Sequence, residues 1–213
     1  MMQAANVSSS AEPLWSEVLQ VERPKRRTLL DGFADFNDFR VRPLGREDFR
    51  SVWQSAAARL TPYCFDPDRQ QVVFVESPAG VNLIDDHPFF YEAQRRHAIK
   101  LYAVSYDAVI ALAAEIPRLA PQPPIIFLHS TGRCGSTLLC RLLGDAVGTV
   151  SVSEPDFYSQ LVLMREGMAP AEEIRLARVT AACTQLLVAH LQTTHPAAQS
   201  VVIKLRGVAV FVA

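Results

Sequence analysis

A short glycine-bearing turn between an apolar run and a helical pattern constrains the fold more than any other feature of this chain. Residues 125–129 read Ile-Ile-Phe-Leu-His without alternation, which is typical of a strand buried on both faces of a parallel sheet. The leucines after the turn have helical spacing: Leu138, Leu139, Leu142 and Leu143. A strand that turns directly into a helix gathers backbone N–H groups at the positive end of the helix dipole, a geometry that binds phosphate or sulfate.

The turn itself is rich in residues suited to holding an anion. They are Gly132, Arg133, Cys134, Gly135, Ser136 and Thr137. The glycines let the backbone curl, the two hydroxyls are donors, and the arginine adds a permanent charge and a fork of N–H groups. A nucleotide-hydrolase loop would carry a lysine directly before its hydroxyl residue, and none stands between Gly135 and Ser136. This departure weakens a kinase or hydrolase interpretation, and a turn without any ligand is the remaining alternative.

Two further apolar segments and a helical segment follow the strand, turn and helix described above. Residues 149–153 and 201–205 read as buried strands, and Pro170 with two following glutamates marks the start of a helix that runs to about residue 192. The order strand, helix, strand, helix, strand predicts an α/β fold, a P-loop-like parallel sheet flanked by helices.

The N-terminal half predicts a smaller α+β region. We expect a flexible leader over residues 1–22, a helix near residues 46–60 and a strand over residues 71–76. Four prolines between residues 117 and 124 mark a linker. The expected division is therefore leader 1–22, α+β region 23–118 and P-loop-like α/β domain 122–213.

Composition limits the classes of partner that we expect this chain to bind. The 213 residues carry a formal net charge of -1, which argues against a nucleic-acid surface covering the whole protein. The cysteines fit no metal or secreted disulfide pattern, and we expect reduced thiols and no metal: Cys64, Cys134, Cys140 and Cys183. No signal peptide or bilayer-spanning run is visible in the sequence, so we expect a cytoplasmic protein without a membrane partner.

The segment from Phe127 to Leu139 resembles the phosphosulfate-binding loop of the sulfotransferase superfamily. Arg133 to Thr137 fill the places of its basic residue, small residue, glycine and two hydroxyl residues. Ser153-Glu154-Pro155 and the upstream segment from Pro88 to Arg95 also resemble bacterial proteins of this group. The resemblance covers roughly residues 86–206, and the loop is its most specific part.

The resemblance implies transfer of a sulfuryl group from 3'-phosphoadenosine 5'-phosphosulfate to a hydroxyl acceptor. It places Arg133 at the leaving phosphate and the six turn residues, 132–137, around the donor. Glu154 follows the second strand, at the sheet edge where the loop opens, and is similar in position to the glutamate base of tyrosylprotein sulfotransferases. The alternative for Glu154 is a cap of the following segment.

Members of this superfamily bind the donor's 3'-phosphate through an arginine and a serine on later elements, and the apolar tail 207–213 offers no such pair. The chain thus resembles a member truncated at its C-terminus, from which we expect little transfer activity. A small complete protein whose tail packs back on the sheet is the alternative. The other functions left open are a P-loop kinase or nucleotide hydrolase and an inactive anion- or nucleotide-binding fragment. The acceptor and the oligomeric state are open.

Overall fold

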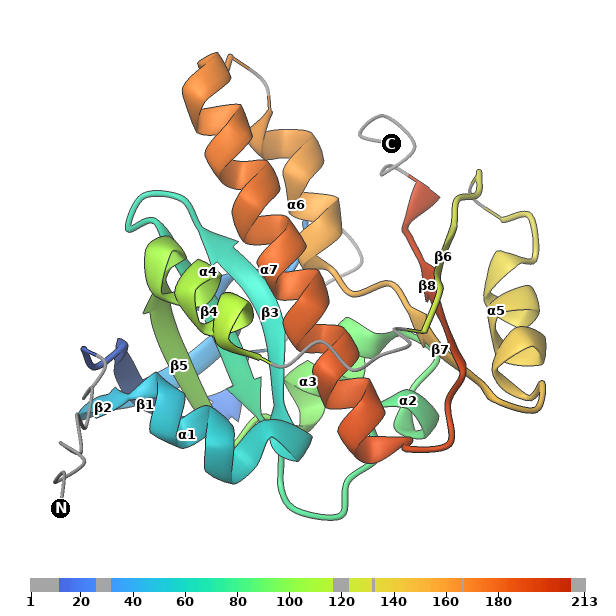
Figure 1. Ribbon diagram of the computed structural model, residues 1–213, viewed down its shortest axis with the longest axis horizontal. Helices are drawn as coiled ribbons and strands as arrows, with labels where there is room; N and C mark the ends of the chain where they lie inside the picture. Colours follow the sequence, from blue (N-terminus) through green and yellow to red (C-terminus); the bar gives the residue numbers. More distant parts are fainter. Residues whose placement is uncertain (1–11, 26–31, 117–122, 132, 166, 208–213) are drawn as a thin grey trace, which may run out of the picture.

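The described part of the chain forms two β-sheets with a long helix between them (Figure 1). The computed structural model describes residues 12–25, 32–116, 123–131, 133–165 and 167–207. Gly132, part of the proposed linker (117–122) and most of the apolar tail (208–213) therefore lie outside the described residues. The architecture is α/β, with an open antiparallel sheet and a smaller parallel sheet.

The first sheet has five strands in the order β2-β1-β5-β4-β3, all antiparallel. Its strands are β1 (Trp15–Pro24), β2 (Phe39–Asp48), β3 (Leu60–Asp66), β4 (Gln71–Glu76) and β5 (Lys100–Ser105). The strand expected over residues 71–76 is confirmed as β4. The leader expected over residues 1–22 is wrong from Trp15 onward, because β1 is paired on both edges and buries Val18 and Leu19 in the clusters on its two faces.

Short helices accompany this sheet: α1 (Phe49–Ala56), α2 (Leu83–Asp86), α3 (Phe90–His97) and α4 (Tyr106–Glu115). Two single 3₁₀ turns, η1 (Phe36–Asp38) and η2 (Ala57–Arg59), complete this half. The helix expected near residues 46–60 is confirmed as the shorter α1. It buries Phe49, Val52, Trp53 and Ala56, the one-faced spacing of an amphipathic helix.

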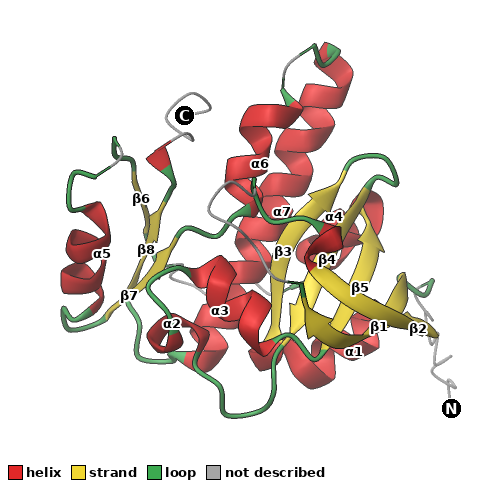
Figure 2. Cartoon of the chain, turned by 180° about the vertical axis from the view of Figure 1, so that it is seen from behind, coloured by secondary structure: helices red, strands yellow, loops and turns green. Residues whose placement is uncertain are grey.

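The second sheet has three parallel strands in the order β6-β8-β7. They are β6 (Ile125–Leu128), β7 (Thr149–Ser153) and β8 (Ser200–Lys204), and they confirm the three parallel strands expected from the sequence. Its helices are α5 (Ser136–Gly144), α6 (Phe157–Met164) and α7 (Pro170–Thr194). Figure 2 shows α5 on one side of this sheet and α6 and α7 on the other.

The expectation that residues 125–129 are buried on both faces is wrong. Ile126 is 51% exposed and Phe127 42% exposed. The reason is topological: β6 is an edge strand of the sheet, and α5 packs against β7 and β8. Within the described residues, β7 and β8 both bury their central side chains, and β8 lies between the other two strands.

Helix α7 joins the two halves. Its start at Pro170 was expected, since proline suits the first turn. Its buried residues share one hydrophobic cluster with Phe65 and Phe74 of the antiparallel sheet and with Val152 and Ile203 of the parallel sheet. No helix in the described ranges combines the length and apolar character needed to cross a bilayer.

Candidate anion-binding site

The turn between β6 and α5 has the geometry of a helix N-terminal loop. Gly135 precedes the helix at φ 81°, and its carbonyl accepts the N–H of Leu139 at 3.0 Å as an early bond of α5. The left-handed conformation of Gly135 is the one that glycine adopts without strain. The hydroxyl of Ser130 donates to the Ser136 hydroxyl at 2.9 Å and so ties the two ends of the turn together.

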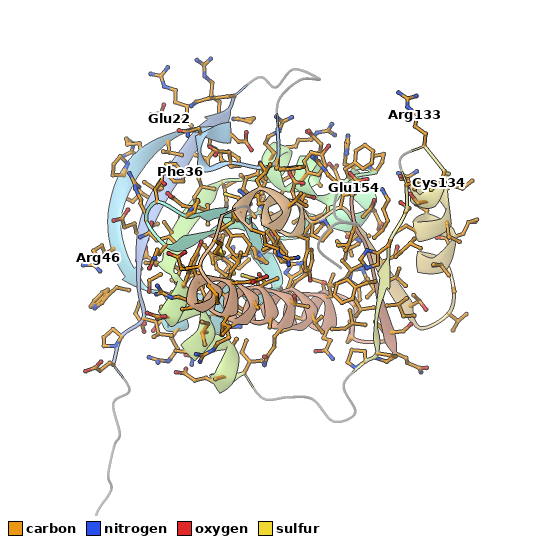
Figure 3. The ribbon with its side chains drawn as sticks, turned by 90° about the horizontal axis from the view of Figure 1, so that it is seen from above. Glu22, Phe36, Arg46, Arg133, Cys134 and Glu154 are labelled. Carbon is orange, nitrogen blue, oxygen red and sulfur yellow. The ribbon has the colours of Figure 1, made fainter. Side chains whose placement is uncertain are left out.

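The side chains of the turn are accessible. Arg133 is exposed and extends outward from the loop, away from Glu154 (Figure 3). Cys134 is a free, exposed thiol, and hydrogen bonds from the side chain and backbone of Ser136 lower its pKa. The partly positive start of a helix is suited to an incoming anion.

Glu154 lies directly after β7 at the carboxyl end of the parallel sheet. Its N–H donates to the Lys204 carbonyl at 2.7 Å, which extends the ladder between β7 and β8 by one bond. Its φ is 59°, a left-handed value that non-glycine residues seldom adopt. Among the described residues, only Gln70, Arg133 and Glu154 are non-glycine residues with positive φ. Both candidate catalytic residues are therefore in this group.

Lys204, at the end of β8, connects Glu154 to the loop. Its ammonium donates to the Glu154 carboxylate and, in a long hydrogen bond of 3.4 Å, to the Thr137 hydroxyl. Lys204 is only 4% exposed. The loop thus has a lysine beside its hydroxyl residue, supplied by a strand 67 positions away. Sequence reasoning assigned Lys204 to a strand and missed this role.

A second cation, Arg206, pairs with the other carboxylate oxygen of Glu154. The Arg206 Nε atom lies 3.4 Å from Glu154 Oε2 and 3.0 Å from Asp156 Oδ1. The Arg206 guanidinium carbon lies 4.1 Å from the centre of the Tyr91 ring, a cation–π contact. Asp156 is fully buried and also accepts the backbone N–H of Ala34. Lys204, Glu154, Arg206 and Asp156 are called the charge cluster below.

The charge cluster ties the candidate site to the N-terminal half of the chain. Tyr91 belongs to the segment 88–95, and the ring centre of Phe89 in that segment lies 5.9 Å from the Lys204 ammonium. Burial raises the pKa of the Tyr91 hydroxyl, while the charge of Arg206 opposes that rise. The rings of Phe89 and Tyr91 therefore contact the two cations of the charge cluster.

A polar cavity of about 530 Å³ adjoins the site. It lies between β7, α5 and the segment after α2, and its lining includes Pro88, Arg141, Ser151 and Ser153. The Ser153 hydroxyl is buried and has no hydrogen-bond partner among the described residues. A larger apolar cavity of about 700 Å³ lies between β6, α6 and α7, and no residue of the loop or of the charge cluster lines it.

The described ranges contain no group of three or more His, Cys, Asp or Glu side chains that could hold a metal ion. Comparisons of the chain with protein-family models, with curated proteins and with solved structures gave no significant match. The site's own geometry therefore carries the functional argument. It offers a strand-to-helix turn suited to an anion, a buried lysine at that turn, and a carboxylate that the lysine contacts.

Proposed function

We propose that this chain binds 3'-phosphoadenosine 5'-phosphosulfate at the turn 132–137 and transfers its sulfuryl group to a hydroxyl acceptor, as a P-loop-like sulfotransferase. The single observation that carries the proposal is the position of Lys204, whose ammonium contacts both Thr137 of the loop and Glu154. Sulfuryl transfer needs an anion grip and a proton acceptor close together, and this lysine links the two.

In the proposed complex the loop holds the donor's 5'-phosphosulfate. The N–H groups at the start of α5 and the hydroxyls of Ser136 and Thr137 donate to its oxygens, with Gly132 and Gly135 leaving the backbone free of side chains. Cys134 contributes its backbone to the same turn. Arg133 is exposed at the rim, where it can fold over the bound anion and add charged hydrogen bonds.

The reaction is an in-line displacement at sulfur. The acceptor oxygen forms a bond to sulfur, and the bond between sulfur and the 5'-phosphate oxygen breaks, which releases 3',5'-adenosine bisphosphate. The acceptor's proton goes to the Glu154 carboxylate. Arg133 and Lys204 stabilise the negative charge that develops on the departing phosphate.

The polar cavity beside β7 is the proposed entry for the acceptor. It reaches Ser153, the residue directly before Glu154, and the Ser153 hydroxyl is free to bind an incoming polar group. The cavity wall is rich in polar side chains, which suits a hydroxylated acceptor better than an apolar one.

A second function is favoured by the same lysine. Nucleotide kinases and hydrolases need a lysine at the loop that reaches the terminal phosphates, and Lys204 supplies one from β8 although the loop sequence does not. Under this alternative the ligand is a nucleoside triphosphate with magnesium.

Calorimetry separates the two functions. The full chain is titrated with 3',5'-adenosine bisphosphate, ATP with magnesium, and AMP. A clear preference for the bisphosphate supports the sulfotransferase proposal, and a preference for ATP with magnesium overturns it in favour of phosphoryl transfer. A radiolabelled sulfate-transfer assay over a panel of hydroxyl acceptors then tests for turnover, including the expectation from the sequence that turnover is low.

A further inference from the structure

The charge cluster contains two cations and two carboxylates, and its members differ in the number of ion pairs that they make. Glu154 contacts both cations, Lys204 through one carboxylate oxygen and Arg206 through the other. Arg206 in turn is shared with Asp156. Lys204 has only one carboxylate partner among the described residues, and its other polar contact is the long bond to Thr137.

We infer that the Glu154 carboxylate occupies Lys204 only while no anion is bound. When an anion binds at Thr137, the Lys204 ammonium leaves Glu154 and pairs with the anion. Glu154 then stays paired with Arg206 alone. The inference deepens the proposed function, on whose anion site it rests. It adds that binding of the donor and loss of the ion pair between Lys204 and Glu154, the proposed proton acceptor, are coupled.

The electrostatics permit this exchange. A buried ammonium without a counter-ion is strongly disfavoured, so an anionic partner stabilises the charged side chain of Lys204. An anion at Thr137 provides one, because the ammonium is already 3.4 Å from that hydroxyl. Glu154 is not left unpaired, since Arg206 remains 3.4 Å from its second oxygen. Each charge therefore keeps a partner before and after the exchange.

The exchange also has a chemical consequence. While both cations are in place, each carboxylate oxygen of Glu154 is in an ion pair, so neither oxygen is open to an acceptor hydroxyl. After Lys204 has moved to the anion, Glu154 has one cation fewer and a free oxygen. In the proposed exchange the arriving donor frees one oxygen of Glu154 for the acceptor's proton, whereas in an empty site both oxygens stay in ion pairs.

The inference predicts competition between Glu154 and the anion for Lys204. Binding of inorganic sulfate and of 3',5'-adenosine bisphosphate is measured by calorimetry for the wild-type chain, Glu154→Gln, Lys204→Gln and the double variant. Glu92→Gln is the matched control, because Glu92 pairs with Arg95 on α3. We expect Glu154→Gln to tighten anion binding by about fivefold or more, within the ordinary range of coupling between sites, and Lys204→Gln to weaken it.

The double variant gives the decisive comparison. If Lys204 is the shared group, Glu154→Gln no longer tightens binding once Lys204 is glutamine. A gain that persists in the double variant would mean that removing any nearby negative charge suffices, and it would overturn the exchange. Unchanged or weaker binding in Glu154→Gln would overturn it as well.

Lys204→Gln removes a buried cation, so its melting temperature is measured first. Should it be unfolded, the side-chain ¹⁵N signal of Lys204 and the carboxyl ¹³C signal of Glu154 are followed in the wild-type chain during a sulfate titration. Both signals are expected to move together, and an unchanged lysine signal at saturating sulfate overturns the exchange. Sulfate binding with exchange but no preference for the bisphosphate would reject the sulfotransferase proposal alone.

Discussion

Arg133 and Glu154 share a left-handed backbone conformation that costs a non-glycine residue roughly 1–3 kcal/mol. Such a conformation persists only where the surroundings impose it. For Glu154 the imposing contact is visible, because its N–H is bonded to the carbonyl of Lys204 beyond the end of β7. The strain at these two residues is an independent reason to place function there, beyond the sequence pattern that first suggested it.

The first prediction concerns Arg133. Replacing Arg133 with alanine should weaken binding of 3',5'-adenosine bisphosphate by about 1.5 kcal/mol, the low end for charged hydrogen bonds, because the side chain is exposed. Isothermal calorimetry measures the change. Arg141→Ala, an exposed arginine on α5, is the matched control and should bind as the parent does. Equal affinity of both variants and the parent would remove Arg133 from the anion site.

The second prediction concerns Glu154 as proton acceptor. With a hydroxyl acceptor that supports turnover, Glu154→Gln should lower the transfer rate by about 10²–10⁴, the usual contribution of a general base. Binding of the bisphosphate should tighten, as the exchange of Lys204 requires, since glutamine leaves Lys204 available to the anion. Initial rates at saturating donor measure the effect. A rate within a few-fold of the parent would reduce Glu154 to a structural partner of Lys204.

At the scale of single elements, the helix α5 depends on a close approach to β7. A Cβ atom at Gly144 would lie 2.4 Å from the Ser151 hydroxyl oxygen and 3.2 Å from the Ser151 Cβ. Glycine therefore lets the last turn of α5 pack directly on the strand. This contact fixes the end of the helix whose other end carries the candidate anion-binding turn.

The third prediction tests this approach. Gly144→Ala should lower the free energy of unfolding by about 1 kcal/mol, because the cost of overpacking exceeds the gain in helix propensity. Adding Ser151→Ala removes the nearer of the two clashes and should restore part of the loss. Urea denaturation of the single and double variants measures both effects. If the double variant were no more stable than Gly144→Ala, the clash with Ser151 would not be the cause.

Elements with a strong local signal were predictable from sequence, and others were not. The strands β6, β7 and β8 and the proline-started α7 follow from unbroken apolar runs and helical spacing. Strand β1 was missed, because its sequence mixes Glu17 and Gln20 with Val18 and Leu19 and its stability comes from pairing with β2 and β5. Cross-strand pairing of distant segments leaves little local trace.

The candidate site likewise combines residues with a local sequence signal and residues that only long-range contacts bring to it. The turn 132–137 and Glu154 carry local motifs, so the sequence alone could nominate them as candidates. Lys204 reaches Thr137 because β8 lies between β6 and β7, and strand order is a property of the whole sheet. Arg206 meets Tyr91 only because the two halves of the chain pack together. A sequence read segment by segment contains neither contact.

At the scale of the whole molecule, α7 makes the two sheets one unit. Its buried face belongs to a hydrophobic cluster that includes residues of both sheets, so neither half buries its apolar surface alone. Its C-terminal part also meets the turn after α1, where the His190 Nδ1 atom lies 3.0 Å from the carbonyl oxygen of Ala57. His190 is 5% exposed. The protonation of this one side chain should therefore report on the packing between the halves.

The last prediction follows from His190. Burial lowers its pKa to about 4, with the bond to Ala57 opposing the shift. In the unfolded chain the pKa is about 6.5, so between these values the unfolded state binds more protons and stability falls as the pH falls. The loss should approach about 3 kcal/mol near pH 4 and vanish above pH 7. His190→Gln cannot titrate, so urea denaturation across this range should show a shallower decline for the variant. Because the carboxylates titrate alike in both proteins, parallel curves would mean that His190 is not buried as a neutral side chain between the two halves.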